Sequence, residues 1–316
     1  MIQSRQDETG RGLLTASLPC SRREFLRGLT AGSLALGLGS LPGACRGAAP
    51  GSCHFDIGVC TSASNWEVIH KAGCAYVEES VGKLLNPALS DAEFARFAEA
   101  FIAKGIPVRA CNGFLPGEMK LVGPAARHDD AVTFAGQALR RAKRLGVQIV
   151  VLGSGGARKV PEGFDQAKAE EQFVQVVGRI GQAAEAARVT VAMESLNRSE
   201  TNFGNSLREC LRLINAINHP RVRLTADIYH MLREDEGPDA LTEAGVKVVH
   251  CHLAEKAERR PPGTAGEDFK PYLRALKKVG FRGGISLECR WQNFVEEIGP
   301  AVAALKEQIE AVRAEA

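Results

Sequence analysis

From residue 55 onward, short β-rich runs alternate with longer segments in which apolar residues follow a helical period. Repeated βα units of this kind surround a parallel sheet, because each helix returns the chain to the same edge of the sheet. The alternation therefore predicts an α/β fold. Eight runs are predicted as strands: Phe55–Cys60, Ala75–Glu79, Pro107–Cys111, Gln148–Leu152, Thr190–Glu194, Arg223–Asp227, Val246–His252 and Gly284–Glu288.

The segments between these strands carry helix signals. Two of them open with the residue order of a capping box, Ser-Asp-Ala-Glu from Ser90 and Ser-Leu-Arg-Glu from Ser206. After the eighth strand, apolar residues recur every three or four positions, which predicts a long closing helix. Its core-facing residues are predicted to be Val295, Ile298, Val302, Leu305, Ile309 and Val312.

Eight strands and eight helices in about 265 residues match the size of one (β/α)8 barrel, the TIM barrel. The alternative is an open, doubly wound sheet. A glycine-rich phosphate-binding fingerprint is expected after the first strand of that fold, and none is present there. Gly153 to Gly156 follow the fourth strand instead and are predicted to form a tight βα loop.

The amino terminus differs in composition from the rest of the chain. The pair Arg22-Arg23 precedes a stretch of Gly, Ala and Leu, Gly28 to Leu41, which is too short and too rich in glycine for a permanent membrane anchor. This segment resembles a twin-arginine export signal. We therefore expect residues 1–50 to be a signal and linker, residues 51–316 to be the barrel, and the protein to be exported to the periplasm.

The chain has nine cysteines. Cys20 and Cys45 lie in the predicted leader, which leaves seven without regular spacing. We expect free, buried thiols rather than a disulfide framework. Cys45 follows a sequence similar to a lipoprotein cleavage site, although Pro42 fits it poorly, so a lipid anchor at Cys45 and ordinary signal cleavage both stay open.

Charge argues against a nucleic-acid partner. Five of the 40 basic residues and three of the 37 acidic ones lie in residues 1–45, which leaves a nearly neutral body with 35 against 34. A nucleic-acid-binding face normally carries an excess of positive charge. Aromatic residues make up only 6% of the chain, which disfavours a surface for stacking bases.

The last four predicted strands each end on a residue that can bind a metal: Glu194, Asp227, His252 and Glu288. In a barrel, the carboxyl ends of the strands meet at one mouth. Three carboxylates gathered there repel one another unless a positive charge lies between them. A divalent cation supplies that charge, and this oxygen-rich set with one imidazole favours Mn²⁺, Mg²⁺ or Co²⁺ over Zn²⁺.

Further polar residues lie close to these four in the sequence. His250 shares a strand face with His252, and we expect it to lie lower in the barrel or to brace a carboxylate. The others follow a predicted ligand, and each has a structural alternative, namely a surface ion pair, a helix N-terminal position or a loop cation. They are Asn197, Arg198 and Glu200 after Glu194, His230 after Asp227, and Arg259 after His252.

Taken in order, these motifs resemble the sugar phosphate isomerase/epimerase family, which has the xylose isomerase-like TIM barrel. The motifs are Glu-x-x-Asn-Arg-x-Glu, Asp-x-x-His, His-x-His with a following Arg and Pro-Gly, and a Glu closing the last strand. Ketose 3-epimerases of the tagatose and psicose type are the most similar group, over residues 55–300. The resemblance implies metal binding by Glu194, Asp227, His252 and Glu288, with Mn²⁺ favoured, and sugar contacts by Asn197, Glu200, His230 and Arg259.

The chain departs from the family pattern in one place. The interval from His252 to the Pro262-Gly263 pair is one residue longer than usual. Counting back from the Pro-Gly pair selects Arg259 as the sugar-binding arginine, whereas counting forward from His252 selects Glu258. The assignment of Arg259 therefore depends on the shape of this loop.

The implied reaction removes a proton from a carbon beside a ketose carbonyl and passes through an enediolate. One of Glu194 and Glu288 removes the proton and the other returns one to the opposite face, as general base and general acid. Return to the adjacent carbon gives aldose–ketose isomerisation instead. A metal-dependent lyase or deglycosidase on keto-sugars and a non-catalytic sugar-binding protein stay open as alternatives.

A DNA-repair role is disfavoured within the same fold. The apurinic endonuclease relatives bind three zinc ions and need further histidines at the earlier strand ends. Cys60, Glu79, Asn112 and Gly153 occupy those places here. The expected partner is therefore a small sugar and no nucleic acid, and self-association through the barrel helices is left open.

Overall fold

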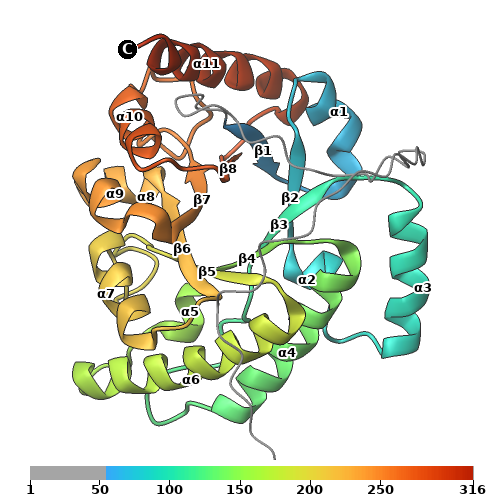
Figure 1. Cartoon of the computed structure of the whole chain (residues 1–316), viewed down its shortest axis with the longest axis vertical. Coiled ribbons are helices and arrows are strands. Elements are labelled where there is room, and N and C mark those ends of the chain that lie inside the picture. Colours follow the sequence, from blue (N-terminus) through green and yellow to red (C-terminus); the bar gives the residue numbers. More distant parts are fainter. Residues whose placement is uncertain (1–54, 316) are drawn as a thin grey trace, which may run out of the picture. The chain divides into compact units, whose positions relative to one another are not determined.

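The computed structural model describes residues 55–315. Eight parallel strands close into a barrel in chain order, with the first beside the last (Figure 1). This closure confirms the predicted TIM barrel and excludes the open sheet. The strands are β1 (Asp56–Cys60), β2 (Tyr76–Ser80), β3 (Val108–Asn112), β4 (Ile149–Leu152), β5 (Thr190–Glu194), β6 (Val222–Asp227), β7 (Val248–Leu253) and β8 (Gly284–Leu287).

The helices surround the strands on the outside of the barrel (Figure 1). They are α1 (Trp66–Lys71), α2 (Val81–Leu84), α3 (Asp91–Ile102), α4 (His128–Leu145), α5 (Gly155–Arg158), α6 (Gln166–Ala187), α7 (Leu207–Ile217), α8 (Ile228–Arg233), α9 (Asp239–Ala244), α10 (Lys270–Lys278) and α11 (Phe294–Ala314), with the 3-10 turns η1 (Ala63–Asn65) and η2 (Gly245–Lys247). The predicted export signal, the linker and Cys45 lie outside the described residues and stay predictions.

Seven of the predicted strands agree with the structure to within one residue at each end. The exception is the start of β7, because Val246 lies in the 3-10 turn η2 and is 83% exposed. Pairing with β6 begins only at Val248, opposite Leu224. Val246 is apolar like the strand residues Val248 and Val249, so residue type alone does not distinguish its position in the turn from a position in the strand.

The helix signals are confirmed with two corrections. Ser90 and Glu93 form the predicted reciprocal capping box at α3. At α7, Ser206 accepts a hydrogen bond from the Glu209 N–H, but the Glu209 carboxylate accepts from the amides of Gly204 and Asn205, not from Ser206. In α11, Val295 is 66% exposed, since it lies in the first turn, before the helix meets the core.

The core has two layers. A large apolar layer fills the space between the strands and the helices. A small one lies inside the barrel and consists of Ala110, Ile149, Val151 and Ala192, with Val249 against it. This inner layer comes from the first and middle residues of β3, β4, β5 and β7, so it lies below the carboxyl ends of the strands.

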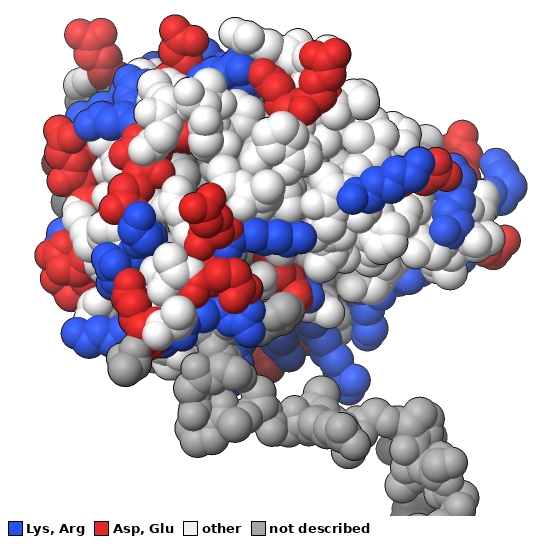
Figure 2. Space-filling view, turned by 90° about the horizontal axis from the view of Figure 1, so that it is seen from above, with Lys and Arg blue, Asp and Glu red and all other residues white. Residues whose placement is uncertain are grey.

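Several composition-based predictions can be compared with the described residues. All six of their cysteines are free, and Cys74, Cys111, Cys210 and Cys251 are buried. On the face seen in Figure 2, acidic and basic side chains are interspersed rather than separated by sign. No helix within residues 55–315 is long and apolar enough to cross a membrane.

Candidate metal and sugar site

The four predicted ligands meet at the carboxyl end of the barrel. Glu194 and Asp227 end β5 and β6, His252 is the last but one residue of β7, and Glu288 follows β8 directly. The parallel register aligns these positions, with Asp227 opposite His252. One ligand atom from each residue lies within 4.8 Å of the other three.

His252 faces the three carboxylates through one ring nitrogen. Its Nδ1 lies 2.7 Å from Glu194 Oε1, 2.8 Å from Glu288 Oε2 and 4.0 Å from Asp227 Oδ2. The side chains of His252, Asp227 and Glu194 are at most 7% exposed, and that of Glu288 is 27% exposed. The cluster is therefore buried except at Glu288, whose side chain is partly exposed to solvent.

Charge in this cluster is unbalanced. Burial, followed by the nearby charges of Glu288 and Asp227, raises the pKa of Glu194 above its ordinary value, although His252 opposes this. Burial also raises the pKa of Glu288, but His252 and Arg259 outweigh it and bring that pKa down to about 2. Three carboxylates and one imidazole at this spacing fit a hard divalent cation, which would supply the missing positive charge.

Arg259 lies beside the cluster. Its Nη2 is 2.8 Å from Glu288 Oε2 and 3.4 Å from Asp227 Oδ2, and its guanidinium stacks over the Tyr229 ring at 4.7 Å. Glu258 is exposed instead. The structure therefore places the residue found by counting back from the Pro-Gly pair at the site.

A residue that the sequence analysis missed shapes this loop. The carboxylate of Glu255, which is fully buried, accepts hydrogen bonds from the amides of Gly263, Ala265 and Gly266. The loop between these points carries Arg259, whose φ of 59° is unusual for a residue with a side chain. Glu255 thus stabilises the bend that directs Arg259 inward.

His230, Asn197 and Glu200 form the other wall. The backbone amide of Asn197 donates to His230 Nδ1 at 3.1 Å, so the proton of the neutral ring is on Nε2. That Nε2 is 3.5 Å from Asp227 Oδ2 and 4.0 Å from Glu200 Oε1, and it has no hydrogen-bond partner among residues 55–315. His230 also lies at the start of α8, where the Asp227 carboxylate accepts a hydrogen bond from its amide. The helix N-terminal position is confirmed, and the sugar contact stays a prediction.

Two loop interpretations need correction. Arg198 forms a surface ion pair, but with Glu234 rather than with Glu200, which lies 3.6 Å from Arg259 instead. Of the predicted βα loop from Gly153 to Gly156, Gly153 and Ser154 form a tight loop, whereas Gly155 and Gly156 begin α5. A Cβ at Gly153 would clash with the Glu194 carboxylate, so glycine leaves the space that Glu194 occupies.

The second strand brings in Glu78, which the sequence analysis also missed. Glu78 points into the barrel and contacts both histidines of β7, whereas Glu79, the residue assigned to this strand end, accepts hydrogen bonds from the amides of Ala63 and Ser80. Burial alone would raise the pKa of Glu78, but His252 and His250 hold it well below the usual range. His250 therefore braces a carboxylate, as predicted.

A family model described as "Xylose isomerase-like TIM barrel" matches residues 66–315. The chain belongs to this family. An L-ribulose 3-epimerase from Methylomonas sp. is 32% identical over 116 residues, which is 36% of this chain and 40% of that protein. A D-psicose 3-epimerase from Agrobacterium fabrum is 26% identical over 207 residues, covering 63% of this chain and 70% of its own length.

The match to solved structures covers about four fifths of this chain. A 3-keto-D-glucoside 4-epimerase from E. coli covers 80% of this chain and 100% of its own, with a TM-score of 0.69 and 18% identity. A D-psicose 3-epimerase with D-tagatose from Clostridium cellulolyticum has a TM-score of 0.66, 21% identity and coverage of 82% and 96%. At these identities the likeness shows the fold. In sequence, the matched segments span about two fifths of the first curated relatives.

Proposed function

We propose that this chain is a divalent metal-dependent sugar epimerase or isomerase that exchanges a proton on a carbon beside a ketose carbonyl. The observation that carries the proposal is the cluster of Glu194, Asp227, His252 and Glu288, whose ligand atoms lie within 4.8 Å of one another at the barrel mouth. The names of the relatives, ketose 3-epimerases among them, support the same reaction class.

These four residues would hold the ion, with Mn²⁺ as the favoured choice. When bound, a divalent cation stabilises negative charge that develops on the substrate oxygens. Glu194 and Glu288 handle the proton. One of them removes the proton from one face of the substrate, and the other returns a proton to the opposite face.

The sugar hydroxyls meet a separate set of groups. His230 offers a proton on Nε2, Arg259 offers guanidinium N–H groups, and Glu200 and Asn197 line the same wall. A donor, a cation and an acceptor arranged in this way can fix the orientation of a polyol. The predicted export favours free or glycosidic keto-sugars over sugar phosphates, which are mostly cytoplasmic.

Solvent exchange tests the proposal. The chain, loaded with Mn²⁺, is incubated in D₂O with free ketoses, keto-glycosides and sugar phosphates, the metal is removed, and the sugars are examined by NMR. Deuterium at one carbon with inversion identifies an epimerase, and deuterium at the adjacent carbon an isomerase. Loss of a leaving group would identify a lyase, and binding without exchange a sugar-binding protein. Either of the last two results would refute the proposal.

A further inference from the structure

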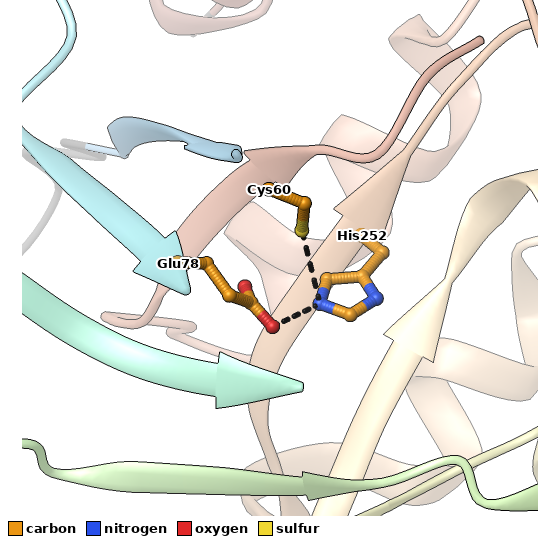
Figure 3. A group of neighbouring side chains, drawn as sticks. All are labelled: Cys60, Glu78 and His252. Carbon is orange, nitrogen blue, oxygen red and sulfur yellow. Dashed lines mark hydrogen bonds and ion pairs between the residues drawn. The ribbon is translucent and has the colours of Figure 1, made fainter. Parts of the chain in front are cut away.

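Below the four-ligand cluster, one carboxylate joins two imidazoles inside the barrel. Glu78 is 1% exposed and extends from β2 toward β7 (Figure 3). Its Oε1 lies 2.9 Å from His252 Nε2 and its Oε2 lies 2.7 Å from His250 Nε2. Ser286 Oγ also lies within hydrogen-bond distance of His250 Nε2, at 3.4 Å, and it forms a hydrogen bond of 2.9 Å with the Tyr76 hydroxyl.

The two nitrogens of His252 therefore have different neighbours. Nδ1 faces the carboxylates of the cluster, and Nε2 faces Glu78. A neutral imidazole carries one proton, and its other nitrogen has the lone pair that binds a metal. A carboxylate accepts a hydrogen bond but cannot donate one, so Glu78 retains a proton on Nε2. Glu194 and Glu288 accept in the same way from Nδ1, and an ion held by the cluster would replace the proton there, which leaves the Nδ1 lone pair for the metal.

We propose that Glu78 is a positioning residue of the metal site, which holds His252 in the Nε2–H tautomer and fixes the ring so that Nδ1 points at the ion. Carboxylate partners of metal-binding histidines orient the ring in this way, and losing one typically weakens metal affinity about 10–100-fold. The proposal rests on the metal site of the proposed function but not on its sugar chemistry.

Cys60 offers a competing interpretation. Its Sγ lies 4.0 Å from His252 Nε2, and Cys60, Glu78 and His252 together could themselves hold an ion (Figure 3). In that arrangement His252 would bridge two ions and Glu78 would be a ligand. The four-ligand cluster is favoured as the ion site because it offers three carboxylates and an imidazole, whereas this group offers one carboxylate, an imidazole and a soft thiol, a poorer set for a hard divalent cation.

Calorimetric titration of the metal-stripped chain with MnCl₂ tests the proposal without any sugar. Glu78→Gln keeps the shape of the side chain, but an amide can either donate to Nε2 or accept from it and no longer selects the tautomer. We expect one ion per chain, an affinity about 10–100-fold weaker in Glu78→Gln, and wild-type affinity in Glu79→Gln. Glu79 is the matched control because it is the next residue but points away from both histidines.

Unchanged affinity in Glu78→Gln would overturn the proposal. So would two ions in the wild type, one of which is lost in both Glu78→Gln and Cys60→Ser. If circular dichroism shows that Glu78→Gln does not fold, long-range ¹H–¹⁵N spectra of the wild type loaded with Zn²⁺ decide the question, since a proton on Nδ1 of His252 refutes the assignment. A chain that binds one ion as expected but exchanges no sugar proton would refute the proposed function alone.

Discussion

The two ends of the barrel are built from the same eight strands but carry different chemistry. The carboxyl end holds the four-ligand cluster, with Arg259 and His230 beside it. The amino end has a hollow of about 410 Å³, lined by residues such as Arg109, Ile149, Val249 and Phe281. Within residues 55–315, both groups of side chains that could hold a metal lie toward the carboxyl end.

The connections explain the difference. At the carboxyl end, the chain runs from Leu253 to Lys270 between β7 and α10, which leaves room for the loop that Glu255 shapes. At the amino end, only three residues join α4 to β4 and two join α6 to β5. Long loops can present reactive groups, whereas short ones mainly close the fold. Substitutions at the carboxyl end should therefore mainly change activity, and substitutions at the amino end should mainly change stability.

Removing the metal should have the largest effect. We expect EDTA to abolish proton exchange and Mn²⁺ to restore it. The chain should remain folded without metal, because the core layers do not depend on the ion. Free metal at about 100 times its dissociation constant raises the free energy of unfolding by about 2.7 kcal/mol. Loss of the metal should therefore lower Tm by about 5–10 °C. Exchange that persists in a chain shown to be metal-free would refute the metal site.

Substitution of either catalytic glutamate should have the second largest effect. Glu194→Gln and Glu288→Gln should each lower kcat by about 10²–10⁴-fold, which is the usual contribution of a general acid or base. Circular dichroism should show an unchanged fold, because these residues lie at the mouth and outside the inner core layer. Substantial turnover in either variant would argue against a two-carboxylate reaction.

Arg259→Ala should weaken sugar binding. The loss of charged hydrogen bonds of about 1.5–3 kcal/mol predicts a rise in KM of about 10–100-fold. Arg260→Ala is the control, because the neighbouring arginine pairs with Glu297 instead of facing the cluster. Equal effects in the two variants would mean that the loop as a whole matters rather than the Arg259 guanidinium.

Ile149→Ala tests the amino end. Ile149 is 8% exposed in the inner apolar layer, and its truncation should cost about 2 kcal/mol of stability. Chemical denaturation measures this loss. The kcat of the folded fraction should stay at the wild-type value, because the residue lies at the end opposite the cluster. A large change in kcat would show that the two ends are coupled.

The smallest effect concerns pH in the metal-free chain. Burial raises the pKa of Glu194 in the folded state. The unfolded chain then gives up this proton at lower pH than the folded one, so this residue lowers stability as pH rises above about 4.5, the ordinary carboxyl pKa. Glu194→Gln should therefore gain in Tm over the wild type by a few degrees between about pH 4 and pH 8. Thermal unfolding in EDTA measures Tm of both chains at each pH. A difference in Tm that does not change with pH would contradict this prediction.

The sequence alone determined the barrel and its principal cluster. Strands of a (β/α)8 fold recur at a regular spacing and run in one direction, so the last residues of four strands must meet at one mouth. Glu194, Asp227, His252 and Glu288 could therefore be grouped without coordinates, and the structure brings them together. The eight β-rich runs and the helical segments between them supplied the number of units.

Only the tertiary structure decided which neighbours of these residues take part. Glu78 and His250 are 172 positions apart, and no local pattern links them. The choice of Glu78 over Glu79, or of Arg259 over Glu258, depends on a shift of a single residue, which turns a side chain from the barrel interior to the outside or to solvent. That shift is set by strand register and by the loop that Glu255 holds, both of which arise from contacts across the barrel.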